Sequence, residues 1–166
     1  MSELRNIEKG ALLQRQGEKA SCFFKVHSGL LRSFFVDDMG KEHVFMFAPK
    51  DWIISDLDAI GFDAPCALSI EALEPSLIEF LPIHQGEHRV LALEGGQDEF
   101  IRLMRHAGTL QRRVLLLMSS SALERYEYFL ETYPDLSPRL TQKLMASYLG
   151  ITPQRLSMIR AERVGK

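Results

Sequence analysis

Short apolar segments separated by turns fill the first half of the chain, and glycines recur between them. Each segment has the length and the Phe, Val, Leu and Ile content of a β-strand. These segments lie at residues 23–29, 30–36, 42–48, 67–73 and 77–83. Asp37-Asp38-Met39-Gly40 supplies a turn, so the second and third segments form a hairpin. Many short strands at regular spacing predict a small antiparallel β-barrel or jelly roll.

A helical period replaces this pattern after Gly95-Gly96. Apolar residues then recur every three or four positions, which predicts an amphipathic helix over residues 98–119 with a heptad seam. The seam consists of Phe100, Leu103, Ala107, Leu110, Val114 and Leu117. Spacing alone leaves open whether this face packs on its own barrel or on a second copy of the chain. Another helix follows over residues 123–133 and ends at Pro134-Asp135.

Two short helices, over residues 141–149 and 153–163, end the pattern, and Gly150-Ile151-Thr152 joins them. Gly150 suits the left-handed backbone of a sharp turn between helices. Thr152 is a good N-cap, and Pro153 then occupies the first helical position, where its missing N–H costs nothing. This arrangement is typical of a helix-turn-helix.

The apolar positions of this motif predict which face is buried. Ala146 is small enough for the second helix to cross closely over the first, and we expect four leucine or isoleucine side chains to pack inward: Leu144, Leu149, Leu156 and Ile159. The side left exposed carries Gln154, Arg155, Ser157, Met158 and Ala161. A recognition helix presents such N-terminal residues to base edges in the major groove.

The exposed residue types fit DNA chemistry. The Gln154 amide can pair with adenine, the Ser157 hydroxyl can contact several bases, and Met158 can pack on a thymine methyl. Phosphate contacts are expected from Thr152, with the helix N-terminus, and from three arginines, Arg155, Arg160 and Arg163. An ordinary helical hairpin remains the alternative.

Charge is distributed unevenly along the chain, whose net charge is −2. Residues 139–166 hold six Lys or Arg against Glu162 alone, a net charge of +5, whereas residues 1–138 hold 14 Lys or Arg and 21 Asp or Glu, a net charge of −7. A basic segment on an acidic body is expected of a nucleic-acid-binding element, although a solvated basic tail has the same charge.

Other classes of protein fit poorly. The longest apolar runs, such as residues 114–118, are too short to span a bilayer, and the N-terminus has no signal-peptide pattern. Cys22 and Cys66 are too few for an iron–sulfur cluster or a disulfide framework, so we expect a reduced, cytoplasmic chain. No nucleotide-binding loop or nucleophile motif is present, and we expect no enzyme. His84 and His88 form a weak metal pair without an obvious third ligand, so we expect no metal.

The order of these elements resembles the Crp/Fnr family of bacterial transcription regulators. The resemblance rests on Leu12-Leu13 followed by Gly17-Glu18, Ser28-Gly29-Leu30-Leu31-Arg32, Gly40-Lys41-Glu42 and Leu149-Gly150-Ile151-Thr152-Pro153. The C-terminal segment is especially similar to a branch common in Bacteroidetes. The resemblance implies an α+β fold with an effector-sensing β-barrel at 1–95, a dimerisation helix at 96–119 and a helix-turn-helix DNA-binding domain at 120–166. It also implies a homodimer, with the long helix as the seam.

The chain departs from the family where cyclic nucleotides bind. The family's Gly-Glu pair aligns with Ser55-Asp56, and its phosphate-binding Arg-Ser pair aligns with Cys66-Ala67. The resemblance implies an effector pocket at Ser55, Asp56, Leu57, Cys66 and Ala67, in which Asp56 can still accept a ribose hydroxyl. Cys66 supplies no positive charge for a phosphate. We therefore expect no tight binding of cyclic AMP, unless Arg32 or Lys50 replaces the missing arginine.

The leading hypothesis is a homodimeric regulator that binds double-stranded DNA and responds to an unidentified small effector other than cyclic AMP. The family's additional N-terminal segment and the β-wing after the recognition helix are expected to be missing. The missing wing favours an alternative, a barrel that senses a small molecule and signals through protein contacts, with a vestigial DNA-binding domain. A cupin enzyme is disfavoured because the clustered His and Glu of a cupin metal centre are lacking.

Overall fold

The computed structural model describes residues 2–82 and 96–164, in two compact units, Met1–His106 and Ala107–Lys166. The division falls inside the long helix, whereas the sequence analysis gave that helix a segment of its own at 96–119. No helix within the described residues combines the length and apolar content needed to cross a bilayer.

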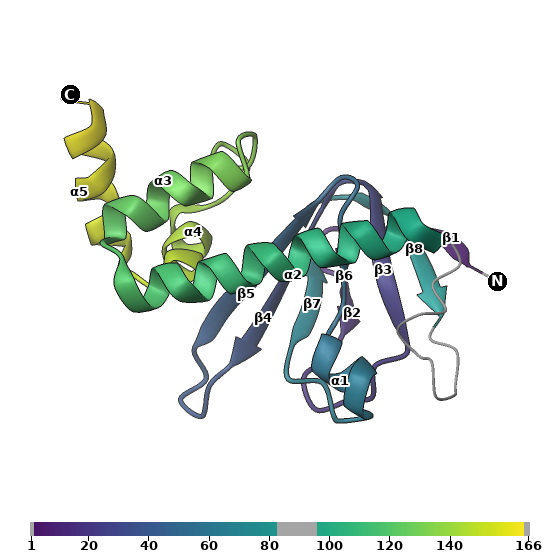
Figure 1. Ribbon diagram of the computed structural model, residues 1–166. Coiled ribbons are helices and arrows are strands. Elements are labelled where there is room, and N and C mark those ends of the chain that lie inside the picture. The colour runs from purple at the N-terminus through teal and green to yellow at the C-terminus, as the bar shows by residue number, and fades with distance from the viewer. Residues whose placement is uncertain (1, 83–95, 165–166) are drawn as a thin grey trace. The chain divides into compact units, whose positions relative to one another are not determined.

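Two four-stranded antiparallel sheets make up the first unit (Figure 1). Their orders are β1-β8-β3-β6 and β2-β7-β4-β5. The strands are β1 Glu3–Ile7, β2 Leu12–Gln14, β3 Cys22–Ser28, β4 Leu30–Val36, β5 Glu42–Pro49, β6 Ile53–Ile54, β7 Ser69–Ala72 and β8 Ser76–Pro82, and one helix, α1 Leu57–Phe62, lies between β6 and β7. The predicted hairpin is β4–β5, paired from Leu30↔Pro49 to Val36↔Glu42.

Large apolar side chains fill the interior of this unit. Phe23 on β3, Phe47 on β5 and Ile78 on β8 are each at most 1% exposed. Gly29, between β3 and β4, has φ +95°, and a Cβ there would lie 2.1 Å from the Ser76 hydroxyl oxygen. That hydroxyl also accepts from the Leu30 N–H. A side chain at position 29 would therefore break both the turn and its support.

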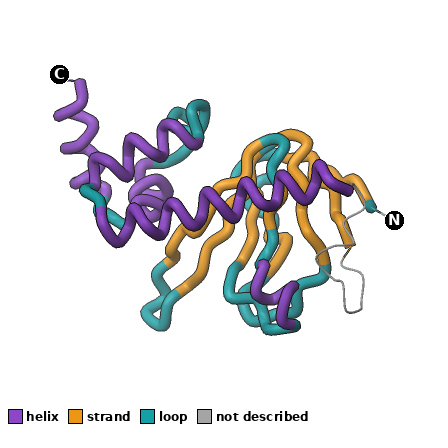
Figure 2. Tube along the Cα trace, in the orientation of Figure 1, coloured by secondary structure: helices purple, strands orange, loops and turns teal. Residues whose placement is uncertain are grey.

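Among the described residues four helices follow, and Figure 2 shows the change from strands to helices along the chain. They are α2 Gly96–Ser119, α3 Ala122–Thr132, α4 Gln142–Leu149 and α5 Pro153–Val164. Ser121 begins α3 in a capping box with Glu124, and Thr141 caps α4. Phe129, Tyr133 and Tyr148 form the aromatic core of the second unit, with ring centroids 5.4 to 5.8 Å apart.

Candidate nucleic-acid interface

The turn between α4 and α5 has the geometry that its sequence predicts. Gly150 ends α4 with φ +66°, in the left-handed region. The Ile151 N–H donates to the Ala146 carbonyl at 3.0 Å. The Thr152 hydroxyl accepts from the Arg155 N–H at 3.2 Å, so Thr152 caps α5 as expected. Local chemistry therefore fixes the angle at which α5 leaves α4.

Burial separates the two faces of α5. Leu156 and Ile159 are fully buried, and Ala146 on α4 is 1% exposed. One inward position differs from the expectation: Leu144 is only half-buried, whereas its neighbour Met145 is fully buried. The prediction of Leu144 as a core residue was wrong, because α4 turns the Met145 side chain toward α5 instead.

The outward face of α5 carries the residues proposed to contact bases. Gln154, Arg155, Ser157, Met158 and Ala161 are all exposed, and Met158 has 54% of its surface open. An exposed methionine beside polar side chains on one helix face offers both apolar and hydrogen-bonding contacts. This face can therefore bind a charged surface that presents both apolar and hydrogen-bonding groups.

The basic side chains of α5 are held in different ways. Arg155 is exposed and pairs with Glu162, with Nη1 and Oε1 3.5 Å apart. The Arg160 guanidinium is half-buried, because it contacts the Met145 sulfur at 3.1 Å and lies over the Tyr126 ring. Arg163 is exposed. Arg155 and Arg163 are therefore more open to a phosphate than Arg160.

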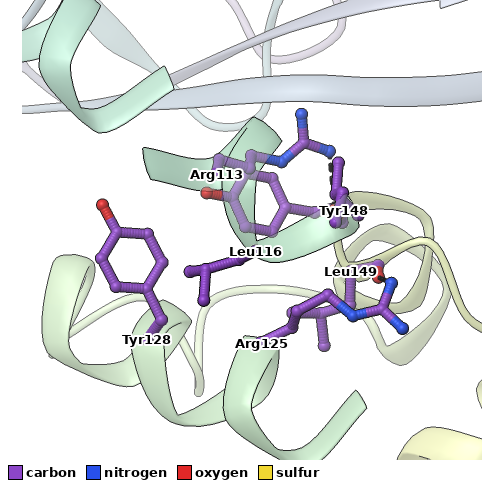
Figure 3. Close-up of a pocket in the computed structure, with 7 residues that line it drawn as sticks. Arg113, Leu116, Arg125, Tyr128, Tyr148 and Leu149 are labelled. Carbon is purple, nitrogen blue, oxygen red and sulfur yellow. Dashed lines mark hydrogen bonds between the residues drawn. The ribbon is translucent and has the colours of Figure 1, made fainter. Parts of the chain in front are cut away.

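Two arginines outside the motif hold it in place, and the sequence analysis missed both roles. Arg113 of α2 donates to the Tyr148 carbonyl at 2.7 Å, and Arg125 of α3 donates to the Leu149 carbonyl at 2.8 Å (Figure 3). These carbonyls end α4, where positive charge is favourable. Arg113 also lies over the Tyr148 ring, 4.4 Å from its centroid, and burial raises the pKa of Tyr148 to about 12.

The pocket at this joint is lined by Arg113, Leu116, Leu117, Arg125, Tyr128, Tyr148 and Leu149 (Figure 3). Its volume is about 10 Å³. That is no more than one water molecule occupies, so the joint is a packing contact and offers no space for an effector.

The residues expected to form the effector pocket lie together in the first unit, where Asp56 links them. Asp56 is 3% exposed, and its carboxylate caps α1 by accepting from the Ala59 N–H. Its other oxygen accepts from the Ala67 N–H at 2.7 Å and the Leu68 N–H at 2.9 Å. The Asp56 carboxylate is therefore already hydrogen-bonded to the two backbone N–H groups that lie beside the position predicted for a phosphate.

The other side chains of this group have little capacity for an anion. The Ser55 hydroxyl donates to the Cys22 carbonyl at 3.0 Å, and Leu57 is exposed at the start of α1. Cys66 is buried, and burial raises the pKa of its thiol, so it carries no charge at neutral pH.

Of the two cations considered as substitutes for the missing arginine, Arg32 is already paired within the protein. Arg32 is buried between two carboxylates, 2.8 Å from Glu42 and 2.6 Å from Glu71, and it stacks over Phe34. Its charge is therefore already compensated. Lys50 is exposed at the end of β5. The expectation that cyclic AMP does not bind tightly stays a prediction.

The α2 seam is more exposed, and broader, than the heptad pattern indicates. Phe100, Val114 and Leu117 are 39% to 49% exposed, whereas Ala107 and Leu110 are half-buried and the Leu103 side chain lies outside the described residues. Four further apolar side chains are exposed on the same helix: Ile101, Met104, Leu115 and Met118. None of the four belongs to the predicted seam, although a second heptad offset, 100, 104, 107, 111, 114 and 118, contains two of them.

Two histidines in the described residues form pairs with carboxylates. His27 lies 2.8 Å from Glu79, and His43 lies 2.7 Å from Asp37. No group of three His, Cys, Asp or Glu side chains in residues 2–82 and 96–164 is arranged to hold a metal ion. His84 and His88 lie outside the described residues.

Comparison with known proteins connects this geometry to a family. Residues 4–88 match the cyclic nucleotide-binding domain. The transcriptional activator protein FnrA of Stutzerimonas stutzeri is 31% identical over 172 residues, covering 93% of this chain and 68% of the relative. The transcriptional activator protein Anr of Pseudomonas protegens is 29% identical over 161 residues, covering 95% of this chain and 62% of the relative. The chain thus spans 62% to 68% of the length of these two relatives.

Solved structures agree. A transcriptional regulator of the CRP/FNR family from Thermus thermophilus has a TM-score of 0.75 at 17% identity, covering 96% of this chain and 84% of that one. This chain belongs to the Crp/Fnr family. FixK2 from Bradyrhizobium japonicum has the same TM-score at 15% identity, covering 98% of this Crp/Fnr chain and 84% of its own. The predicted family and α+β class are confirmed, whereas the likeness to a Bacteroidetes branch stays a prediction.

Proposed function

We propose that this Crp/Fnr chain is a transcription regulator that binds double-stranded DNA as a homodimer. The observation that carries the proposal is the division of α5 into a fully buried face, with Leu156 and Ile159, and an exposed face. Gln154, Ser157 and Met158 on that face offer amide, hydroxyl and apolar contacts to base edges. Relatives described as transcriptional activators support the same function.

The dependence of DNA affinity on salt concentration distinguishes phosphate contacts from base contacts. Replacing Arg155 with alanine is expected to weaken binding to all DNA sequences alike, because one phosphate contact and its released counterions are lost. The slope of log K against log salt is negative, and its magnitude should fall by about 0.9. Glu162→Gln is the matched variant with the opposite effect: it frees Arg155 from its 3.5 Å ion pair and should tighten binding. Fluorescence anisotropy at several salt concentrations measures both.

If Arg155→Ala instead abolished the preference at one base pair and left the salt slope unchanged, Arg155 would be a base-reading residue. The assignment to phosphate would then be wrong, although DNA binding itself would stand.

The exposed apolar face of α2 supports the homodimer. Phe100, Met104, Val114, Leu115 and Met118 expose between 40% and 80% of their surfaces in a single chain. Exposure of large apolar side chains to water along one helix is unfavourable. Packing of the same helix from a second copy of the chain would bury these side chains. We propose this face as the dimer seam, in place of one centred on Leu110.

A charge on this face tests the seam. Met118→Glu places a carboxylate at a position that is 80% exposed in one chain, so the fold should tolerate it, but dimerisation would bury it without a partner. We expect sedimentation velocity to show monomer for this variant and dimer for the original chain. Met39→Glu, in the turn between β4 and β5 and 88% exposed, makes the same chemical change away from α2 and should leave the dimer intact. A dimeric Met118→Glu chain would contradict the seam.

The β-barrel unit is proposed to bind a small effector that is neutral or apolar. The proposal rests on the neutral Cys66 thiol and on the occupied backbone donors at Ala67 and Leu68. An effector of this kind regulates DNA binding only if it binds one of two dimer states more tightly than the other.

A further inference from the structure

Gln142, the first residue of α4, is bonded to the recognition helix by its side chain. Its Nε2 donates to the Pro153 carbonyl at 2.7 Å and also to the Ser157 hydroxyl oxygen. A carbonyl only accepts hydrogen bonds, so the amide NH₂ must point at Pro153, and this fixes which end of the amide is nitrogen. Both amide hydrogens are thus used within the protein. The amide oxygen must point the other way.

The Ser157 hydroxyl is oriented by the same contacts. Its oxygen accepts from Gln142, and its hydrogen is directed at the Pro153 carbonyl, 3.3 Å away. A hydroxyl has one donor and two lone pairs, so one lone pair is left to face outward. Both Gln142 and Ser157 are exposed. Within the part of the chain that the structure describes, no N–H or O–H group donates to the Gln142 amide oxygen.

We infer that Gln142 is a positioning residue that makes Ser157 a hydrogen-bond acceptor toward DNA, so that the site selects an amino base, adenine or cytosine, on the contacted strand. The inference rests on the proposed DNA binding. In the major groove only the N6 amine of adenine and the N4 amine of cytosine donate hydrogen bonds, whereas guanine and thymine present acceptors. The Ser157 hydroxyl oxygen and the Gln142 amide oxygen are both acceptors, so they would repel the acceptor groups of guanine and thymine. Phosphate oxygens also only accept, so this pair is unsuited to the DNA backbone.

The test measures base preference at every position of a half-site. The full chain is first used to select sites from a random DNA pool, and competition binding then compares all four bases at each position. We expect one position to favour adenine or cytosine over guanine or thymine by roughly five- to tenfold. Ser157→Ala and Gln142→Ala should both flatten that same position to less than about twofold, and the double variant should lose no more than either single variant.

Two controls separate this role from a general effect on folding or affinity. Ser157→Thr keeps the hydroxyl and should keep the preference. Lys143→Ala removes an exposed cation next to Gln142 and should weaken binding to all sequences while leaving the base preference unchanged. Circular dichroism of each variant confirms that the helices are intact.

The inference is overturned if the position that responds to Ser157→Ala favours guanine or thymine, if Ser157→Ala changes no position, or if Gln142→Ala weakens all sequences equally. Those outcomes leave the proposed function standing. If the pool yields no selected site at all, the proposed function fails, and this inference fails with it.

Discussion

Titration of the full chain with cyclic AMP is expected to give no measurable binding at micromolar concentrations. A cyclic phosphate carries a full negative charge, and its transfer into the protein is costly without hydrogen bonds or a positive charge. Cys66, which the resemblance aligns with the family's phosphate-binding arginine, offers a neutral, buried thiol. Each missing charge-assisted hydrogen bond is worth about 1.5–3 kcal/mol, and several together weaken binding by several powers of ten.

Asp56 makes the same position unfavourable in a second way. Its carboxylate already accepts from the Ala67 and Leu68 N–H groups, so a phosphate approaching those donors would meet a negative charge. Isothermal titration with cyclic AMP, cyclic GMP and adenosine tests the argument, because adenosine lacks the phosphate. We expect neither cyclic nucleotide to bind more tightly than adenosine. Micromolar binding of cyclic AMP that adenosine does not share would show that a cation does reach the phosphate.

Replacing Asp56 with alanine is expected to lower the free energy of unfolding by about 3–5 kcal/mol. The carboxylate is almost fully buried and accepts from three backbone N–H groups, those of Ala59, Ala67 and Leu68, at 2.7 to 3.2 Å. Hydrogen bonds to a charged group contribute about 1.5–3 kcal/mol each, with partial recovery where water replaces them. Urea denaturation, analysed with a common slope for both proteins, measures the loss.

Asp58→Ala is the matched control for this substitution. Asp58 lies in the first turn of α1, two residues after the Asp56 cap, but it is exposed and acts on α1 only through the helix dipole. Its loss should cost less than about 1 kcal/mol. If the two variants were equally stable, the Asp56 carboxylate would not be the link between α1 and the segment before β7.

The helix-turn-helix could be predicted from sequence because its determinants are local. Gly150, Thr152 and Pro153 each act through their own backbone or the next turn of helix, and the structure has them as expected. The strands of the hairpin β4–β5 were predicted within a residue for the same reason, since a turn and two apolar runs define them. Where the determinants were distant in sequence, prediction failed.

Strand β1 shows the limit most clearly. Residues 3–7 are mostly exposed and polar, and they form a strand because they pair with β8, from Glu3↔Phe80 to Ile7↔Ser76. Helix α1 contains Gly61 and has only six residues, so its own sequence favours a helix weakly; the cap from Asp56 supports it. The pairing of β1 with β8 is not visible in a window of neighbouring residues, whereas the Asp56 cap is a local signal.

The candidate sites were predicted only in part, because some of their contacts also join residues that are distant in sequence. No local pattern indicates a role for Arg113, which is half-buried because it donates to the carbonyl end of α4, 35 residues further on. The heptad seam predicted from spacing did not include Met104 and Met118, and only the exposed surface of the folded chain favours the offset that contains them. The bond from Gln142 to Ser157 likewise depends on how α4 and α5 cross.

Selection from a random DNA pool by the full chain, followed by determination of the number of chains on each selected site, tests DNA recognition by a homodimer most directly. The proposed function predicts a pseudo-palindromic site occupied by two chains, with half-site centres about one helical turn apart, roughly 34–36 Å. Recovery of no enriched sequence, or of a single half-site bound by one chain, would contradict it.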